Sequence, residues 1–187
     1  MPESTATSKY VRFNIPGDAH ALSFACFRNR RFLNYSLTRK YFIEALSAAR
    51  KKHNFHIWAY VIMPEHAHLL IFPRNESYSI SDILQSIKQP VARKAIRFLR
   101  QNRPEVLRLM ETGEKHHPYR FWQDGGGYDR NIRDHDELVR FVEYAHDNPV
   151  KRGLVEKPED WYWSSAREWI SGEHGPIRVD KESFPVM

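Results

Sequence analysis

The sequence predicts a protein in which antiparallel strands are combined with helices. Two runs, Phe55 to Ile62 and His66 to Phe72, are rich in β-branched, aromatic and other apolar residues. Only Met63-Pro64-Glu65 separates them, which predicts a tight antiparallel hairpin. Apolar residues recur at helical spacing on both sides of this hairpin, so helices are expected before and after it. The 187 residues suffice for one domain with a substantial core, and no internal repeat divides them.

Two regular elements are expected before the hairpin. Ala19 to Phe27 shows partial apolar alternation and predicts a first strand, and Arg28 to Arg31 then form a basic loop. From Leu37 to Lys52 apolar residues recur at helical spacing, with basic residues in the last turn, which predicts a helix. The chain begins with small polar residues, so residues 1–14 are expected to form a flexible tip.

A second helix follows the hairpin. Ser79 or Ser81 is expected to cap it, its apolar residues reach Leu99, and Pro90 within it predicts a kink or a break. Residues 102–119 are polar and mixed and are expected to form a loop. Residues 119–123 have the composition of a strand, which the three glycines at 125–127 end.

The last long helix carries the most informative residues. Asp134, followed three residues later by a glutamate, predicts its start, and Pro149 predicts its end. Tyr144 then lies on the flank of the packing stripe, and Asn148 lies one turn beyond it on the same side. Residues 161–170 are expected to form a short helix anchored by aromatic side chains, and residues 171–187 a loose tail.

The composition of the chain indicates which classes of molecule it is suited to bind. The chain has 29 Lys and Arg against 23 Asp and Glu, a net charge of +6, and 13% aromatic residues. These values suit a polyanion whose bases can stack, although a modest positive charge is also common on proteins that bind no anion. Cys26 is the single cysteine, which excludes an internal disulfide and a cysteine-based zinc cluster. No run approaches ~18 apolar residues, so we expect a cytoplasmic protein without a membrane partner.

His66 and His68 are one residue apart at the start of an apolar strand. Alternate side chains of a strand point the same way, and two neutral imidazoles on one face form a natural pair of ligands for a divalent metal ion. The other explanation is that both rings lie on the solvated face of a half-buried hairpin. Two ligands do not complete a site, so a third ligand and a nucleophile must come from elsewhere.

Tyr144 and Asn148 have the chemistry to complete the site. A tyrosine hydroxyl is a weak nucleophile and needs a base, or an electrophile that activates the phosphate. Mg²⁺ or Mn²⁺ on His66, His68 and Asn148 would polarise a scissile phosphate while Tyr144 faces the phosphorus. Taken singly, Tyr144 is explained as a surface aromatic residue and Asn148 as a helix C-cap. Taken together, the four residues predict phosphodiester cleavage by covalent catalysis.

Two segments, Val61 to Leu70 and Tyr144 to Val155, resemble the signature of the single-tyrosine HUH transposases. The similarity is greatest to the REP-associated tyrosine transposases of the IS200-like group, and it runs from roughly Ile15 to Ile170, a single HUH domain. It implies an α+β fold of the HUH-nuclease type, with a ferredoxin-like (RRM-like) central antiparallel sheet and helices packed on it. The two histidines would lie on a central strand, and the tyrosine on a helix beside it.

The same resemblance implies cleavage and rejoining of single-stranded DNA beside a REP-like hairpin, through a covalent 5′-phosphotyrosine. Tyr144 matches the nucleophile, His66 and His68 match the metal ligands, and Asn148 matches the polar residue that completes the site. Glu65 would support the first histidine. The glycines at 125–127 depart from the family pattern, which bears on DNA sequence preference.

DNA contacts are expected from basic and aromatic side chains. Phosphate contacts are assigned to Lys88, Arg93, Arg97, Arg100, Arg120, Lys151 and Arg152, and base stacking to Trp122 and Tyr128. The arginines at 93, 97 and 100 form one stripe of a helix, which a solvated face would also explain. Core packing is the other explanation for the aromatic residues.

Other functions remain open. A histidine-triad phosphohydrolase needs a third histidine at position 70, which is a leucine. A domesticated, non-catalytic nucleic-acid-binding module of the same fold is the main alternative, although the four site residues are intact. Replication initiators and relaxases share the chemistry but usually carry larger domains. Both a monomer acting in cis and a homodimer with shared sites fit the sequence.

Overall fold

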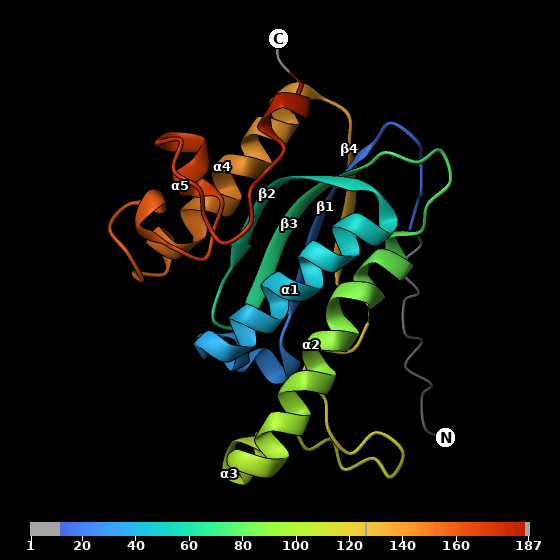
Figure 1. Ribbon diagram of the computed structural model, residues 1–187, viewed down its shortest axis with the longest axis vertical. Helices are drawn as coiled ribbons and strands as arrows, with labels where there is room; N and C mark the ends of the chain where they lie inside the picture. Colours follow the sequence, from blue (N-terminus) through green and yellow to red (C-terminus); the bar gives the residue numbers. More distant parts are fainter. Residues whose placement is uncertain (1–11, 126, 186–187) are drawn as a thin grey trace, which may run out of the picture.

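A computed structural model describes residues 12–125 and 127–185. Its centre is a four-stranded antiparallel sheet in the order β2-β3-β1-β4. The strands are β1 Ala19–Ala25, β2 Phe55–Ile62, β3 His66–Pro73 and β4 Tyr128–Ile132. Two long helices, α1 Ser36–His53 and α2 Ile80–Asn102, cross one face of the sheet (Figure 1). This order of strands and helices is that of a ferredoxin-like fold and confirms the predicted α+β class.

The main core lies between the sheet and the helices α1 and α2. Leu22, Leu69 and Ile71 point from the strands into this core. Ser79 caps α2 as expected, because its hydroxyl accepts a hydrogen bond of 3.2 Å from the Asp82 N–H. Of the kink or break expected at Pro90, the break is wrong, since α2 continues through the proline. Apolar side chains of α2 are buried on both sides of the proline, and their burial outweighs the one hydrogen bond that it loses.

Helix α4, His135–Lys151, packs on the opposite face of the sheet through Leu138 and Val142. Asp134 caps it as expected, because its Oδ1 accepts a hydrogen bond of 2.9 Å from the Glu137 N–H. The expected end at Pro149 is wrong, since the helix runs on to Lys151.

A side chain explains why α4 tolerates its proline. Pro149 has no N–H to donate to the carbonyl of Ala145, four residues earlier. The Asn148 side-chain amide lies 3.4 Å from that carbonyl and donates a shorter bond, 2.8 Å, to the carbonyl of Tyr144. The amide thus compensates in part for the missing backbone donor.

Residues 102–132 differ most from expectation. The expected loop contains the short helix α3, Pro104–Leu107, and residues 119–123 form only isolated bridges instead of a strand. The fourth strand is the polar segment β4, which pairs with β1 at the edge of the sheet. Gly127 directly precedes β4 with a positive φ of 72°, and a Cβ there would lie 2.3 Å from the carbonyl oxygen of Ser23. Only glycine fits so close to β1.

The C-terminal segment follows α5, Ala166–Ile170. The expectation of a loose tail is wrong for residues 171–185, because Ile177 and Val179 are only 5% and 2% exposed. Asp180 closes the outer edge of β2: its N–H donates to the Ile57 carbonyl, and its carboxylate accepts from the Ile57 N–H, both at 2.8 Å. Covering an edge strand in this way removes its unpaired backbone groups.

The expected N-terminal tip lies mostly outside the described residues, since residues 1–11 are not among them. Of its remainder, the Phe13 carbonyl accepts a hydrogen bond from Asn131, and Asn14 accepts one from the N–H of Ile80. The other described elements are 3-10 turns at Phe27–Asn29, Phe32–Asn34, Arg108–Met110, Pro158–Asp160 and Lys181–Ser183. Among the described helices, none has both the length and the apolar character needed to cross a membrane.

Candidate active site

His66 and His68 lie on β3, a central strand, and point to the face that α4 covers. Their Nε2 atoms are 2.9 Å apart, and the two rings are nearly perpendicular. His68 is only 5% exposed, and the His66 side chain is 15% exposed. The explanation that places both rings on a solvated face is therefore wrong.

Burial keeps both imidazoles neutral. It lowers the pKa of His68 to about 3, and the neighbouring His66 acts in the same direction. Burial also lowers the pKa of His66, against the opposing effect of Glu65. The neutral ring is the form that binds metal ions. The Nδ1 atom of His68 is buried without a hydrogen-bond partner, so no acceptor of the protein holds a proton on that nitrogen.

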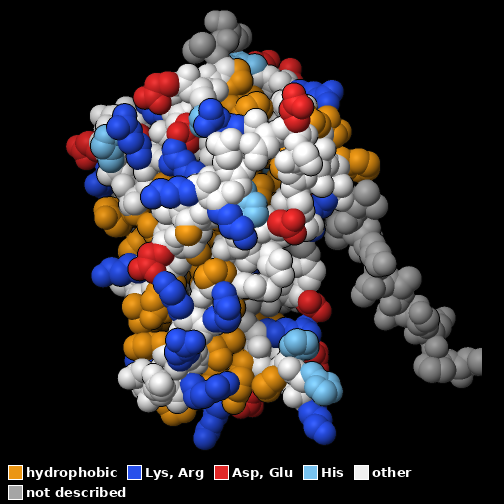
Figure 2. Space-filling view, turned by 45° about the vertical axis from the view of Figure 1, so that its right-hand side comes forward, with side chains coloured by type: hydrophobic (Ala, Val, Ile, Leu, Met, Phe, Trp, Pro, Cys, Tyr) orange, Lys and Arg blue, Asp and Glu red, His pale blue; other side chains and the backbone are white. Residues whose placement is uncertain are grey.

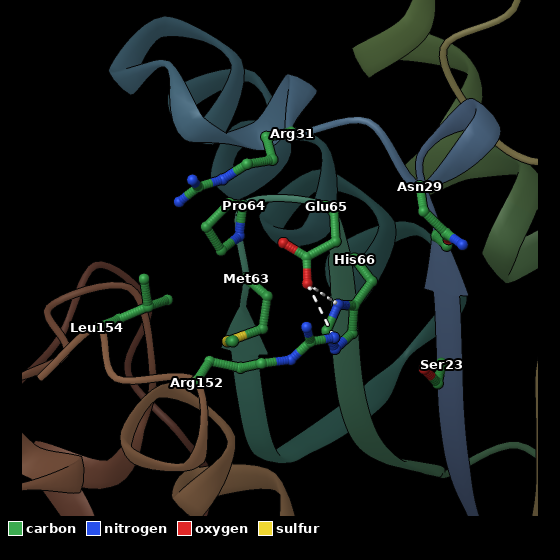
Figure 3. Close-up of a pocket in the computed structure, with 10 residues that line it drawn as sticks. Ser23, Asn29, Arg31, Met63, Pro64, Glu65, His66, Arg152 and Leu154 are labelled. Atoms are coloured by element: carbon green, nitrogen blue, oxygen red, sulfur yellow. Dashed lines mark hydrogen bonds and ion pairs between the residues drawn. The ribbon is translucent and has the colours of Figure 1, made fainter.

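Glu65 fixes the other ring. Its Oε1 lies 3.1 Å from Nδ1 of His66 and 3.4 Å from a guanidinium nitrogen of Arg152, as Figure 3 shows. A carboxylate accepts hydrogen bonds, so Nδ1 of His66 is the donor and its Nε2 is left with a free lone pair. This arrangement is typical of the carboxylate–histidine pairs that orient metal ligands.

Tyr144 lies beside the histidine pair on α4. The centroid of its ring is 5.6 Å from that of His68, and the two rings meet edge to face. The residue is 50% exposed, so a large substrate can reach its side chain. The Nζ atom of Lys151 is 5.4 Å from the centre of the Tyr144 ring. The tyrosine and the imidazoles are thus on the same side of the sheet within one chain.

Asn148 is one helical turn beyond Tyr144. Its amide nitrogen bonds to carbonyls of its own helix, which leaves Oδ1 as the atom for a ligand. Within the described residues no hydrogen bond joins Asn148 to either histidine ring. Nor do those residues contain a group of three or more His, Cys, Asp or Glu side chains that could hold a metal ion. The amide oxygen of Asn148 as the third ligand stays a prediction.

A polar cavity of about 610 Å³ opens beside His66. Ser23, Asn29, Arg31 and Arg152 line it together with the connection between β2 and β3. Sequence patterns did not single out the first three of these residues for the site. The run of arginines from position 28 was the available signal, but only the fold shows that this loop lies next to β3.

Tyr128 extends the same face of the sheet toward β4. Ser23 is directly opposite His68 on one side and Tyr128 on the other. The three side chains therefore form a row across neighbouring strands. Tyr128 is 50% exposed, so its ring is available for the predicted stacking.

The structure separates the predicted arginine stripe from this site. Arg93, Arg97 and Arg100 are exposed on α2, which covers the opposite face of the sheet. Figure 2 shows Lys and Arg side chains gathered over the lower half of a face that includes α2. The stripe and the histidine pair do not converge on one phosphate, so the predicted contacts of these arginines would involve a more distant part of the DNA.

Three other predicted DNA contacts have protein partners. Trp122 is 7% exposed, packs against Phe24 and donates a hydrogen bond to the Lys88 carbonyl, so the prediction that it stacks on bases is wrong. The ammonium of Lys88 lies over the Phe24 ring, and burial lowers its pKa. Arg120 forms ion pairs with Glu114 and Asp124, which already compensate its charge.

The chain is similar to known proteins in sequence and in fold. The sequence profile of a family described as "Transposase IS200 like" matches residues 19–129, which include both histidines and end before Tyr144. A protein of Haemophilus influenzae named as a REP-associated tyrosine transposase is 29% identical over 137 residues, which cover 72% of each chain. A solved structure of a REP-associated tyrosine transposase bound to a REP hairpin superposes with a TM-score of 0.68, at 22% identity over 93% of both chains. The last comparison shows a shared fold.

Proposed function

Because the chain belongs to the IS200-like transposase family, we propose that it cleaves and rejoins single-stranded DNA with Tyr144 as the nucleophile. The observation that supports this most directly is the contact between the rings of Tyr144 and His68. The solved relative holds a REP hairpin, and the proposal extends that substrate class to this chain: DNA that folds into a hairpin beside the cut.

A divalent ion, Mg²⁺ or Mn²⁺, is part of the proposal. Its ligands would be Nε2 of His66, Nε2 of His68 and Oδ1 of Asn148. Two ligands with bonds of about 2.1 Å at right angles lie about 3 Å apart, and the two ring nitrogens are 2.9 Å apart. The imidazole donors favour Mn²⁺ over the harder Mg²⁺. Bound there, the ion would polarise the phosphate and stabilise the charge that develops on it.

The proposed reaction exchanges one phosphate ester for another. The Tyr144 hydroxyl oxygen bonds to phosphorus while the bond from phosphorus to the 3′ oxygen breaks. The phenol proton passes to solvent and the 3′ oxygen takes up a proton, which leaves a 5′-phosphotyrosine and a free 3′ hydroxyl. Rejoining is the reverse attack by a 3′ hydroxyl and needs no other source of energy. Lys151, beside the Tyr144 ring, is placed to contact the bound phosphate.

The same chain contains all four proposed site residues, so a monomer suffices for the reaction in cis. The proposal places the protein in the cytoplasm with its DNA. Light scattering during size-exclusion chromatography, with and without DNA, distinguishes the monomer from a homodimer with shared sites.

A denaturing gel tests the proposal. Hairpin-bearing single-stranded DNA from the region flanking the gene, incubated with Mn²⁺, should give a product linked to the protein. Tyr144→Phe should abolish that product and still shift the DNA on a native gel. Tyr162→Phe is a matched control, because Tyr162 is similarly exposed, at 51%, but packs against Trp163. If the unmodified protein only shifts the DNA, the non-catalytic binding module is correct and the proposal is wrong.

A further inference from the structure

A basic loop beside the site has no role in the reaction proposed above. Arg28, Asn29, Arg30 and Arg31 are consecutive and all exposed. Across the described ranges, 12–125 and 127–185, no carboxylate forms an ion pair with any of these three arginines. Three positive charges without counter-charges from the protein attract an anion.

The backbone of this loop is strained and firmly held. Arg28 and Asn29 have φ values of 55° and 53°, a left-handed conformation that costs a non-glycine residue about 1–2 kcal/mol. Hydrogen bonds fix both sides of the loop: the Arg28 N–H donates to the Gln123 side chain, and the Leu33 N–H donates to the Pro64 carbonyl. The surrounding structure therefore holds the arginines in a fixed position, next to the connection that carries Glu65.

Two cavities meet at this loop. The cavity of about 610 Å³ beside His66 and a second one of about 490 Å³ share Asn29 and Arg31. Arg28, Arg30 and Tyr35 also line the second cavity. The loop lines both cavities, and we call the surface that they form together, from His66 to Tyr35, the loop groove.

The loop groove is positively charged along its length. In Figure 3, the Arg152 side chain extends toward Glu65 and His66, and Arg31 comes from a different element with its guanidinium pointing away from Glu65. Glu65 is the one acidic residue that lines either cavity, and its carboxylate already contacts His66 and Arg152. The remaining charges are those of the arginines.

We propose that the loop groove binds the single-stranded DNA next to the scissile phosphate, with Arg28, Arg30 and Arg31 on its backbone phosphates. The proposal rests on the function proposed above and names the path of its substrate. Guanidinium groups bind phosphate oxygens bidentately, and the exposed ring of Tyr35 offers a surface for a base.

Fluorescence anisotropy measures the phosphate contacts without any need for cleavage. The probe is a labelled thymidine oligomer of about 15 nucleotides, since phosphate contacts do not depend on sequence. The logarithm of the association constant falls linearly with the logarithm of the salt concentration. Each arginine lost should make this slope less steep by about 0.7, which corresponds to an affinity about fourfold lower at 0.15 M salt. Arg31→Ala and Arg28→Ala should each show this loss, and Arg31→Lys should keep most of the slope. Arg74→Ala is the control, because Arg74 is exposed just beyond the far end of β3.

Photo-crosslinking locates the strand. The native Cys26 is buried, and burial raises the pKa of its thiol to about 12, so an introduced cysteine is labelled selectively. A crosslinker on Arg30→Cys should capture the oligomer, and one on Arg74→Cys should not. Equal crosslinking at both positions, or an unchanged salt slope in Arg31→Ala and Arg28→Ala, would overturn the proposal. A protein that binds through these arginines and fails to cleave hairpin DNA would refute the proposed reaction alone.

Discussion

The Tyr144 ring meets the His68 ring edge to face, with their centroids 5.6 Å apart. Each ring belongs to an element with little freedom to move. His68 is on a central strand of the sheet, and Tyr144 is on a helix whose packing residues, Leu138 and Val142, are buried against that sheet. The proposed nucleophile and the proposed ligand pair are thus held by rigid elements and would need little reorganisation before reaction, which favours catalysis.

Removing one imidazole should remove the metal ion. In His68→Ala, only His66 and Asn148 remain as proposed ligands, and we expect Mn²⁺ affinity to fall by at least about 100-fold, with cleavage lost in parallel. Isothermal titration with Mn²⁺ measures the binding directly. The control is His174→Ala, because the His174 side chain is 57% exposed and pairs with Glu168 elsewhere. Unchanged Mn²⁺ affinity in His68→Ala would contradict the proposed ligand pair.

Substitution can separate the observed role of Asn148 in the helix from its proposed role as a metal ligand. Asn148→Asp and Asn148→Ala both lose the amide donor to the carbonyls of Tyr144 and Ala145, so each should lower the free energy of unfolding by about 1 kcal/mol. Asn148→Asp keeps an oxygen ligand and should retain or increase Mn²⁺ affinity, whereas Asn148→Ala should reduce it. Urea unfolding and Mn²⁺ titration report the two effects. Equal Mn²⁺ affinity in both variants would show that Asn148 only stabilises the helix.

Local sequence patterns were sufficient to predict the hairpin of β2 and β3 and the start of α4. The connection between β2 and β3 is so short that antiparallel pairing follows from sequence, and the alternation of a strand puts His66 and His68 on one face. The cap at Asp134 likewise depends on residues within one turn. Sequence could therefore place the histidines on one strand face and the tyrosine on one helix, but their contact depends on how α4 lies across the sheet.

The errors have three different physical causes. Trp122 has the composition of a stacking residue, and only its contacts with Phe24 and Phe42 show that it belongs to the core. The end predicted at Pro149 ignored a side-chain donor, Asn148, that replaces part of the lost backbone bond. Strand β4 is polar and at the edge of the sheet, so it lacks the apolar pattern by which strands are recognised.

The C-terminal segment should contribute strongly to stability. Ile177 is 5% exposed and belongs to the main core, although it lies beyond the last helix. Ile177→Ala should lower the free energy of unfolding by about 2–4 kcal/mol, the usual cost of truncating a buried isoleucine. Urea denaturation measures this loss in the free energy of unfolding. Ile170→Ala is the matched control, since Ile170 is 57% exposed and should change stability by less than about 0.5 kcal/mol. Similar effects of the two substitutions would mean that the segment does not pack as described.

His146 should make the fold sensitive to mild acid. It lies two residues after Tyr144, is buried, and contacts the Ser165 hydroxyl at 2.8 Å. Burial lowers its pKa from 6.5 to about 4, with Asp147 acting in the opposite direction. Between these two pH values the unfolded chain binds a proton at this position and the folded chain does not, so stability rises with pH. Above pH 6.5 His146 therefore does not reduce the free energy of unfolding, and its destabilising effect grows as the pH falls toward 4.

Comparison with a variant isolates this effect from those of the other buried histidines. In His146→Gln the position no longer titrates, while an amide group remains to bond with Ser165. Between about pH 7.5 and about pH 5, the unmodified protein should lose about 2 kcal/mol more of its free energy of unfolding than the variant does. Urea unfolding at the two pH values measures the difference. His66 and His68 contribute equally in both proteins, so identical pH dependence would show that the imidazole of His146 is not held neutral in the folded state.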